Sequence, residues 1–328
     1  MMMETKRLTA AVAMLACVLL AAATHCAAQN FPSRPIRFIV PFAGGGSPDV
    51  LARVVGKRVG ESLGQPVLVE NRPGASGIIA ADLVAKAPAD GHTVFVSSVP
   101  HLAINPHMFP KLPYDPLKDF APISIGVTTQ LFLVVNASLP VRSITEFLDY
   151  AKAHPGLTYG TPGTGSQHHL AMELFKQQAG INLVHVPYKG VAQATLALLA
   201  GEIDMVLTSF PPVAPHVKTG RLRLLAIAEG KRYSRMPELP TIAEAGLPGY
   251  EISTEIGFVA PAGTPKPVVE KLNSEIVKAL TTPEIAQQLI TLGMDPVGST
   301  PEQYGESMRA NYEKYGKLVK LSGARADD

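Results

Sequence analysis

Strand-length apolar runs alternate with helix-period segments along most of the chain, and this alternation constrains the fold more than any other feature. Eight runs are predicted as strands: Ile36–Pro41, Val67–Glu70, Thr93–Ser97, Leu131–Val135, Leu157–Gly160, Val184–Val186, Ile203–Leu207 and Leu222–Ala228. Helix-period segments between them include Val50–Leu63, Ile144–Ala153, His168–Ala179 and Ala192–Ala200. Near-continuous apolar strands are typical of parallel sheets that helices cover on both faces. The alternation therefore predicts an α/β fold built from crossover units.

The N-terminus has the pattern of an export signal. Lys6 and Arg7 precede an apolar stretch from Leu8 to Ala23, and small residues fit cleavage after Ala28. We therefore predict a signal peptide over residues 1–28 and a periplasmic mature protein. The alternative is a membrane anchor, but the apolar stretch is shorter than the ~20 residues that a spanning helix needs.

The rest of the composition limits the architecture and the partners. Both cysteines, Cys17 and Cys26, lie in the segment to be removed, so core burial alone must stabilise the mature chain. About 300 mature residues exceed what one hydrophobic core usually serves, so two lobes are expected. The formal net charge is only +2 and tryptophan is absent. No basic run follows the signal, which disfavours nucleic-acid and membrane-surface binding.

A glycine-rich turn, Phe42–Asp49, joins the first predicted strand to a helix that opens at Ser47-Pro48, with Ser47 expected as its cap. Free N–H groups at a helix N-terminus bind anions without any basic side chain. The turn is not a dinucleotide fingerprint, because Gly-x-Gly-x-x-Gly fails at Asp49, and no Gly-Lys-Ser/Thr follows. We expect it to face a ligand. The alternative is a tight turn in which Asp49 only stabilises the helix dipole.

A second turn, Gly160–Ser166, repeats this design about half the chain away and precedes a helix at His168. The hydroxyls of Thr164 and Ser166, together with free N–H groups, suit a carboxylate. A glycine-rich loop without a ligand is the alternative. A third turn, Asn71–Gly77, has a similar composition, and its arginine at position 72 could pair with a ligand carboxylate or with a neighbouring acid.

Metal and nucleophilic chemistry find little support in the sequence. His168 and His169 are adjacent, so on a helix they point about 100° apart and do not share one ion easily. The sequence has no His-Glu-x-x-His, calcium-loop or Gly-x-Ser-x-Gly pattern. We predict no cofactor, no metal and no catalysis. An exported hydrolase of small esters, with a triad assembled in space, is kept as a less favoured alternative.

Several longer segments resemble the Bug (TctC-like) family of tripartite tricarboxylate transporter receptors, in order and over essentially the whole mature chain. They are residues 36–49, 65–74, 84–91, 112–116, 118–122, 185–190, 239–246 and 261–265. The resemblance implies a type II periplasmic binding protein fold, with two α/β lobes joined by crossing strands. It implies a first lobe of residues 31–127 plus 256–328 and a second lobe of residues 128–255. The ligand would sit between the lobes and close them.

The resemblance also implies where the ligand is held. In such receptors, loops at the lobe interface bind one ligand carboxylate, and by position these are Phe42–Asp49, Ser97–His101 and Thr161–His169. The chain departs from the family pattern at Thr208-Ser209 and at Glu255, which would reshape the distal end of the pocket. Glu255 either faces the cleft, where it disfavours a second carboxylate or selects a donor such as an amine or hydroxyl, or is a solvated hinge residue. The predicted ligand-binding residues are Phe42, Gly45, Gly46, Ser47, Asp49, Ser97, Ser98, Thr161, Thr164, Gly165, Ser166, His169, Thr208, Ser209 and Glu255.

These observations predict a periplasmic receptor, monomeric and without cofactor, that captures a small organic acid and closes around it. It would deliver the acid to the membrane subunits of a tripartite tricarboxylate-type transporter. The alternatives are a receptor for a neutral amide-type ligand and a protein that presents its ligand to a sensor.

Overall fold

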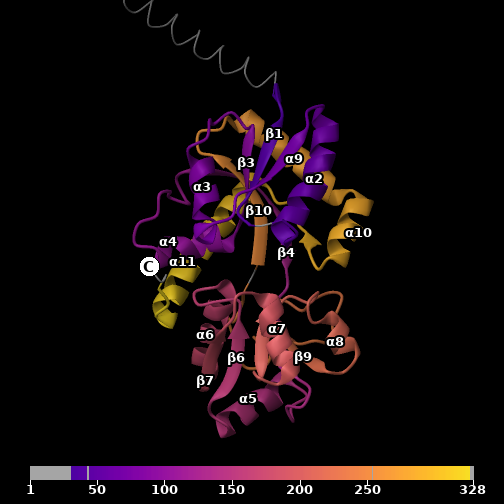
Figure 1. Cartoon of the computed structure of the whole chain (residues 1–328). Coiled ribbons are helices and arrows are strands. Elements are labelled where there is room, and N and C mark those ends of the chain that lie inside the picture. The colour runs from indigo at the N-terminus through magenta and orange to yellow at the C-terminus, as the bar shows by residue number, and fades with distance from the viewer. Residues whose placement is uncertain (1–30, 43, 253, 326–328) are drawn as a thin grey trace, which may run out of the picture.

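Two separate β-sheets organise the chain into two α/β lobes (Figure 1). The structure is a computed structural model that describes residues 31–325 apart from residues 43 and 253. The predicted signal peptide over residues 1–28 lies outside the described residues. No helix in the described part of the chain is long and apolar enough to span a bilayer.

The first sheet has the strand order β11-β4-β10-β3-β1-β2. Its strands are β1 (Ile36–Val40), β2 (Val67–Asn71), β3 (Thr93–Ser98), β4 (Phe120–Thr129), β10 (Thr254–Pro261) and β11 (Asp295–Pro296). The helical elements of this part are α2 (Ser47–Leu63), η1 (Ala75–Gly77), α3 (Ile78–Ala85), the π-helical η2 (Pro100–Ile104), α4 (Asn105–Met108), α9 (Lys266–Thr281), α10 (Pro283–Thr291) and α11 (Pro301–Ser322). Two apolar clusters, centred on Phe38 and on Phe95, form its core.

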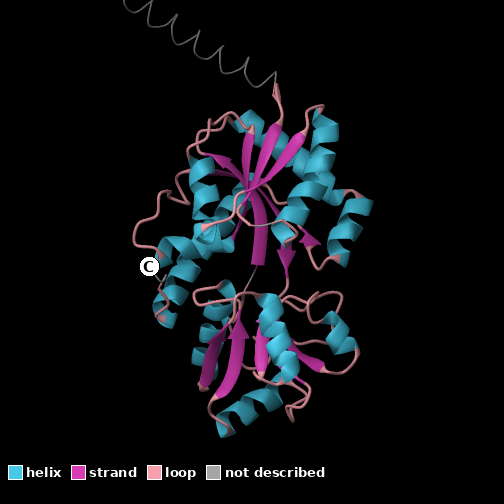
Figure 2. Cartoon of the chain, viewed as in Figure 1, coloured by secondary structure: helices cyan, strands magenta, loops and turns pink. Residues whose placement is uncertain are grey.

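The second sheet has the strand order β7-β6-β8-β5-β9. Its strands are β5 (Phe132–Asn136), β6 (Leu157–Thr161), β7 (Leu183–Pro187), β8 (Met205–Thr208) and β9 (Leu222–Ile227). Its helices are α5 (Ile144–Ala153), α6 (Gln167–Ala179), α7 (Val191–Ala200) and α8 (Ala214–Lys218). Figure 2 shows helices flanking the strands of both sheets, as the apolar runs predict.

All eight predicted strands are present, with ends displaced by no more than two residues. The sequence did not predict β4 and β10, which pair antiparallel with each other and extend toward the second lobe (Figure 1). Pro122, Gly126, Glu255 and Gly257 interrupt their apolar character, so neither strand shows a continuous apolar run. These two strands carry the chain toward and back from the second sheet.

The first sheet takes its strands from residues 36–129 and 254–296, whereas the second takes them from residues 132–227. One shared core crosses this division. Val99 and Ile104 near η2 and Tyr315 and Leu318 of α11 belong to the same buried cluster as Phe147 of the second sheet's layer. The end of α11 therefore packs against α6 of the second lobe, although its start packs on β4. Where the lobes divide as moving bodies stays a prediction.

Candidate functional site

Each sheet has one switch point, where one crossover connection leads to the neighbouring strand on one side and the next leads to the strand on the other side. In the first sheet β1 lies between β2 and β3 and is parallel to both. In the second sheet β6 lies between β7 and β8 and is parallel to both. Ligands of open α/β sheets bind at such switch points, beyond the carboxyl ends of the strands. In Figure 1, β1 runs down toward the lower lobe and β6 runs up toward the upper one, so the two switch points face each other.

The turn after β1 is held by Asp49. This carboxylate is only 4% exposed. It accepts hydrogen bonds from the Gly45 N–H at 2.9 Å, from Asn71 Nδ2 at 2.9 Å and from Arg53 Nε at 3.1 Å. Burial raises its pKa, but the bonds from Arg53, Gly45 and Asn71 together hold the pKa below its usual value. Asp49 is therefore turned into the protein, where it orders the turn.

The start of α2 differs from the sequence expectation. Gly46, not Ser47, is the N-cap residue, and no side chain caps this helix. Ser47 is instead the first helical residue, and its side chain is exposed, as are Gly45 and Gly46. Phe42 is 38% exposed, and its ring lies edge-on to His101 at 5.2 Å. The first turn thus presents backbone, one hydroxyl and one aromatic face.

Ser97 and Ser98, at the end of β3, are buried, and both hydroxyls bond within the protein. Ser97 Oγ lies 3.0 Å from the Tyr304 hydroxyl. The N–H of Ser98 donates to His101 Nδ1 at 3.2 Å, and Ser98 Oγ lies 3.1 Å from the same nitrogen. Burial lowers the pKa of His101 to about 4, so its ring is neutral near pH 7. These residues shape the base of the first switch point.

The third turn packs against that base. Ala75 and Ser76 adopt left-handed φ values of 46° and 52°, a conformation that costs non-glycine residues energy. A Cβ on Gly77 would lie 2.4 Å from the His101 ring, so only glycine fits there. Arg72 donates a hydrogen bond to Glu70 at 2.9 Å. Of its two predicted roles, this is the pairing with a neighbouring acid.

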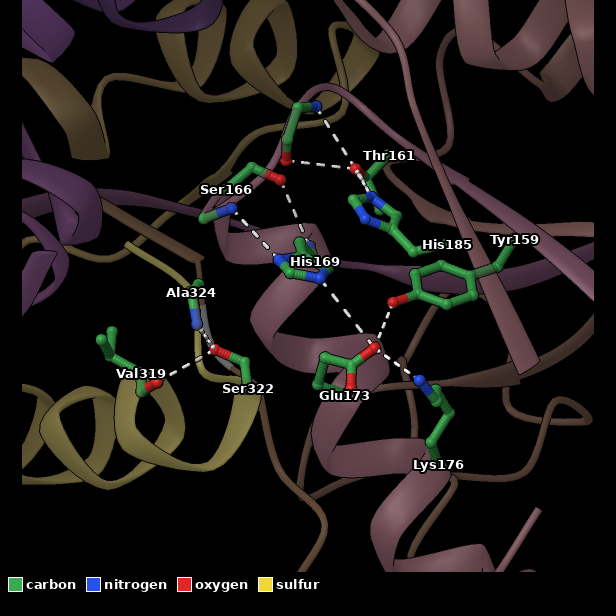
Figure 3. A network of polar contacts seen from close by, with 12 residues as sticks. Tyr159, Thr161, Ser166, His169, Glu173, Lys176, His185, Val319, Ser322 and Ala324 are labelled. Carbon is green, nitrogen blue, oxygen red and sulfur yellow. Dashed lines mark hydrogen bonds and ion pairs between the residues drawn. The ribbon is translucent and has the colours of Figure 1, made fainter. Parts of the chain in front are cut away.

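The second turn rests on a network of polar side chains (Figure 3). Thr161 Oγ1 lies 2.6 Å from His185 Nε2. Ser166 caps α6 by accepting the His169 N–H at 3.2 Å, and the Gly165 N–H donates to His169 Nδ1 at 3.1 Å. The rings of His169 and His185 stack at 4.0 Å. The buried side chains therefore fix the turn from beneath and leave Thr164 exposed.

The charges below this network are paired. Glu173 Oε1 accepts bonds from Lys176 at 2.8 Å and from the Tyr159 hydroxyl, and it lies 3.9 Å from His169 Nε2. Burial lowers the pKa of His169, and it lowers that of His185 to about 4. Both imidazoles are therefore neutral at neutral pH, and the turn above them carries no net charge.

The remaining predicted residues lie at the edges of the two switch points. Thr208, at the end of β8, is 2% exposed, and Ser209 is half-buried. Glu255 accepts bonds from Ser307 Oγ at 2.7 and 2.8 Å and from Asn311 Nδ2 at 3.2 Å. Burial raises the pKa of Glu255 despite those bonds. Glu255 is thus half-buried and bonded to α11, so it is not a solvated hinge residue.

The adjacent histidines on α6 diverge, as expected. His169 enters the network of Figure 3, whereas His168 lines a small cavity together with Thr208. Within residues 31–325, apart from 43 and 253, no group of three or more His, Cys, Asp or Glu side chains is placed to hold a metal ion. His168 and His185 were not predicted as site residues, because neither a histidine beside another on a helix nor a single histidine in a strand has a distinguishing sequence pattern.

Larger cavities lie away from the opposed turns, and two of them adjoin both lobes. One, of about 510 Å³, lies beside the segments that join the two sheets and is called the hinge cavity below; it is lined by Gln130, Glu229, Lys231, Arg232, Tyr233, Glu251 and Asp295 among others. Burial and the nearby Glu251 and Glu255 raise the pKa of Glu229 to about 8. The other, of about 640 Å³, lies between α6 and α11. The lining of the hinge cavity carries both signs of charge, with Lys231 and Arg232 beside Glu251 and Asp295, so charge alone neither selects nor excludes an anion there.

Comparison with known proteins gives a consistent result. A family described as "Tripartite tricarboxylate transporter family receptor" (TctC) matches residues 51–324. Protein BugT of Bordetella pertussis is 37% identical over 305 residues, covering 92% of this chain and 94% of that protein. An R. palustris protein solved with adipate is 36% identical, with a TM-score of 0.78 over 90% of this chain and 99% of that one. MatC from Rhodopseudomonas palustris, solved with bound malate, is 32% identical, with a TM-score of 0.73 over 88% of this chain and 100% of that one.

Proposed function

The chain belongs to the TctC family of tripartite tricarboxylate transporter receptors, and we propose that it captures a small organic acid between its lobes and delivers it to such a transporter. Its type II periplasmic binding protein fold confirms the expectation from the sequence. The family consists of solute-binding receptors, so binding rather than catalysis is the function, and the exported-hydrolase alternative is set aside. We propose the periplasm as the location, because structural relatives are periplasmic binding proteins.

The observation that carries the proposal is the pair of opposed glycine-rich turns. Each turn starts a helix at a switch point and presents backbone and hydroxyl groups, with Ser47 on one side and Thr164 and Ser166 on the other. Helix N-termini favour negative charge, and a carboxylate accepts several hydrogen bonds at once. Adipate and malate, found with two relatives, are both carboxylates. These facts support an organic acid as the ligand class.

Apart from Gly45, whose N–H donates to Asp49, the predicted residues divide into three groups. We assign direct contact with the carboxylate to Gly46, Ser47, Thr164 and Ser166. The hydroxyl of Ser166 accepts the His169 N–H, so its own proton is available to a ligand oxygen. The buried groups that hold the turns act as positioning residues: Asp49, Ser97, Ser98, Thr161, Gly165 and His169. Phe42, Thr208, Ser209 and Glu255 would border the rest of the ligand.

Binding would be coupled to closure of the lobes. A ligand that contacts both turns binds the closed arrangement better than the open one, so it shifts the population toward closure. Closure also excludes water, which strengthens hydrogen bonds to a carboxylate. The transporter would then recognise the closed receptor.

A titration of the mature protein with mono-, di- and tricarboxylates and with the corresponding amides tests this function. We expect at least one acid to bind and its amide to bind more weakly. At 100 times its Kd, the acid should stabilise the fold by about 2.7 kcal/mol. If only the amides bind, the ligand is neutral and the carboxylate assignment is wrong, while the receptor function stands.

The double variant Thr164→Ala/Ser166→Ala tests the assigned residues. It should weaken acid binding at least tenfold, because each lost bond to a carboxylate contributes about 1.5–3 kcal/mol. The matched control is Ser143→Ala, which removes an equivalent cap bond to the Glu146 N–H on α5, outside the turns. An unchanged Kd in the double variant would contradict the assignment.

A further inference from the structure

A small recess lies at the switch point of the second sheet. It is bordered by the ends of β6 and β8, at Gly160 and Thr208, and by the first turns of α6 and α7, at His168 and Val191. Pro162, in the second turn, also lines it. The recess therefore adjoins the turn that we assign to the ligand carboxylate. Its volume of about 10 Å³ is close to what one water molecule needs.

Two polar atoms in this recess are buried and have no hydrogen-bond partner among the described residues: Thr208 Oγ1 and His168 Nδ1. Thr208 is 2% exposed. The other hydroxyl in the lining, that of Thr195, donates to the Val191 carbonyl at 2.9 Å. Most of the remaining lining is apolar, from Ala194, Val206 and Leu207. Buried polar atoms are nearly always paired, so this pair lacks a group that the protein itself does not supply.

The chemistry of the missing group follows from charge and size. No charged side chain lines the recess, and burial lowers the pKa of His168 to about 4, so its ring is neutral near pH 7. A carboxylate or an ammonium group buried there would have no opposite charge. A neutral imidazole nitrogen and a threonine hydroxyl instead match one uncharged O–H group, which can donate to one and accept from the other.

We propose that this recess binds the hydroxyl of a hydroxycarboxylic acid whose carboxylate is held by the adjoining turn. The inference rests on the proposed function, because the carboxylate brings the hydroxyl to the recess. Thr208 and His168 are then the residues that distinguish a hydroxy acid from the same acid without its hydroxyl. An ordered water has the same hydrogen-bonding chemistry as this hydroxyl and is the competing occupant.

Matched pairs of acids test the proposal: succinate with malate, glutarate with 2-hydroxyglutarate, and butyrate with 3-hydroxybutyrate. Isothermal titration would measure Kd for each on the wild type, Thr208→Val and Thr195→Val. Valine keeps the approximate shape of threonine and removes the hydroxyl. Thr195→Val is the matched control, because it lines the same recess and its hydroxyl already bonds to Val191.

We expect the wild type to bind the hydroxylated member of at least one pair about five- to tenfold more tightly, the effect of one neutral hydrogen bond. Thr208→Val should reduce that preference to less than about twofold, because it weakens binding of the hydroxy acid and leaves binding of the acid without the hydroxyl unchanged. Thr195→Val should keep the preference. A purely structural effect of Thr208→Val would weaken both members equally. If Thr208→Val does not fold, His168→Leu should show the same selective loss.

Three results would overturn the proposal. Equal affinities in every pair for the wild type would mean that a water permanently fills the recess or that the ligand does not reach it. A preference that survives in Thr208→Val would place hydroxyl recognition elsewhere. These two results leave the carboxylate receptor intact. Failure of every acid in the panel to bind would overturn the proposed function and this inference with it.

Discussion

The two ligand-facing turns share one local geometry and achieve it with different chemistry. In each, the N–H of a glycine at positive φ donates to the side chain four residues later: Gly45 to Asp49 at 2.9 Å, and Gly165 to His169 at 3.1 Å. In the first turn the acceptor is a buried carboxylate paired with Arg53, whereas in the second it is a neutral imidazole. The carboxylate of the first turn, paired with Arg53, accepts the glycine N–H directly, whereas the nearest carboxylate of the second turn, Glu173, lies beyond His169 and is paired with Lys176. We therefore expect a ligand carboxylate to make its stronger hydrogen bonds with the second turn.

The two glycines themselves should give the largest difference. A Cβ at Gly165 would lie 2.3 Å from Met108 Cε of α4, whereas a Cβ at Gly45 meets nothing within 4 Å. Gly45→Ala should cost only the left-handed strain, about 1–2 kcal/mol. Gly165→Ala should cost somewhat more, about 1.5–3 kcal/mol, because Met108 Cε, the flexible end of its side chain, has to move as well. Urea unfolding of both variants measures the difference.

Truncation of Met108 separates the two contributions to the Gly165→Ala cost. Because Met108→Ala removes the clashing methyl group, Gly165→Ala should lower the free energy of unfolding less in a Met108→Ala background than in the wild type. Equal costs for the two glycine variants would mean that the second turn does not pack against α4.

Removal of the acceptor in the first turn should have the next largest effect. Asp49→Ala leaves the Gly45 N–H, Asn71 and Arg53 without their shared partner and should lower the free energy of unfolding by about 1–3 kcal/mol. Asp49→Asn keeps the shape and should cost less. Urea unfolding measures both. A loss below about 0.5 kcal/mol in Asp49→Ala would show that the turn orders itself without the carboxylate.

Acid should destabilise the fold through buried histidines at both switch points, His101 at the first and His185 at the second. The unfolded chain protonates histidine near pH 6.5, whereas folded His185 takes up its proton only near pH 4. The unfolded state therefore binds more protons in this window, and stability falls as pH drops from about 6.5 to 4, by at most about 1.4 kcal/mol per pH unit for this residue. The pKa of Asp49 is already lowered from 3.8, so its contribution is lost only at more acidic pH.

The variant His185→Gln isolates this pH effect. The wild-type minus variant difference in the free energy of unfolding should shrink as pH falls from 6.5 to 4.5. A difference that is constant with pH would mean that His185 is protonated as readily in the fold as in the unfolded chain.

The exposed hydroxyls should change stability least. Ser47→Ala and Thr164→Ala remove exposed side chains, and each should change the free energy of unfolding by less than about 0.5 kcal/mol. Both should weaken acid binding, Thr164→Ala more than Ser47→Ala. Calorimetry and denaturant unfolding of the same samples test this. A reversed order would make the first turn the stronger carboxylate seat.

The sequence predicted the parts of the fold and site that depend on local pattern. Continuous apolar runs indicated strands of both sheets, and clustered glycines indicated both turns. The expected parallel pairing was wrong for β5, which pairs antiparallel with β8 and β9. The sequence did not predict β4 and β10, because Gly126 and Gly257 interrupt their runs. Nor could it predict the bond partners of Asp49 and His169. The sequence also gives no sign of the recess at Thr208 and His168, which meet only because β6 and β8 pair in the folded sheet.

A crystal structure with a bound acid from the panel would show whether the two opposed switch-point turns share one carboxylate. We expect carboxylate oxygens within about 3 Å of the Thr164 and Ser166 hydroxyls, and the Gly46–Ser47 segment closed over the same group. An acid bound instead in the hinge cavity beside Glu229 and Asp295, or in the groove between α6 and α11, would contradict that expectation.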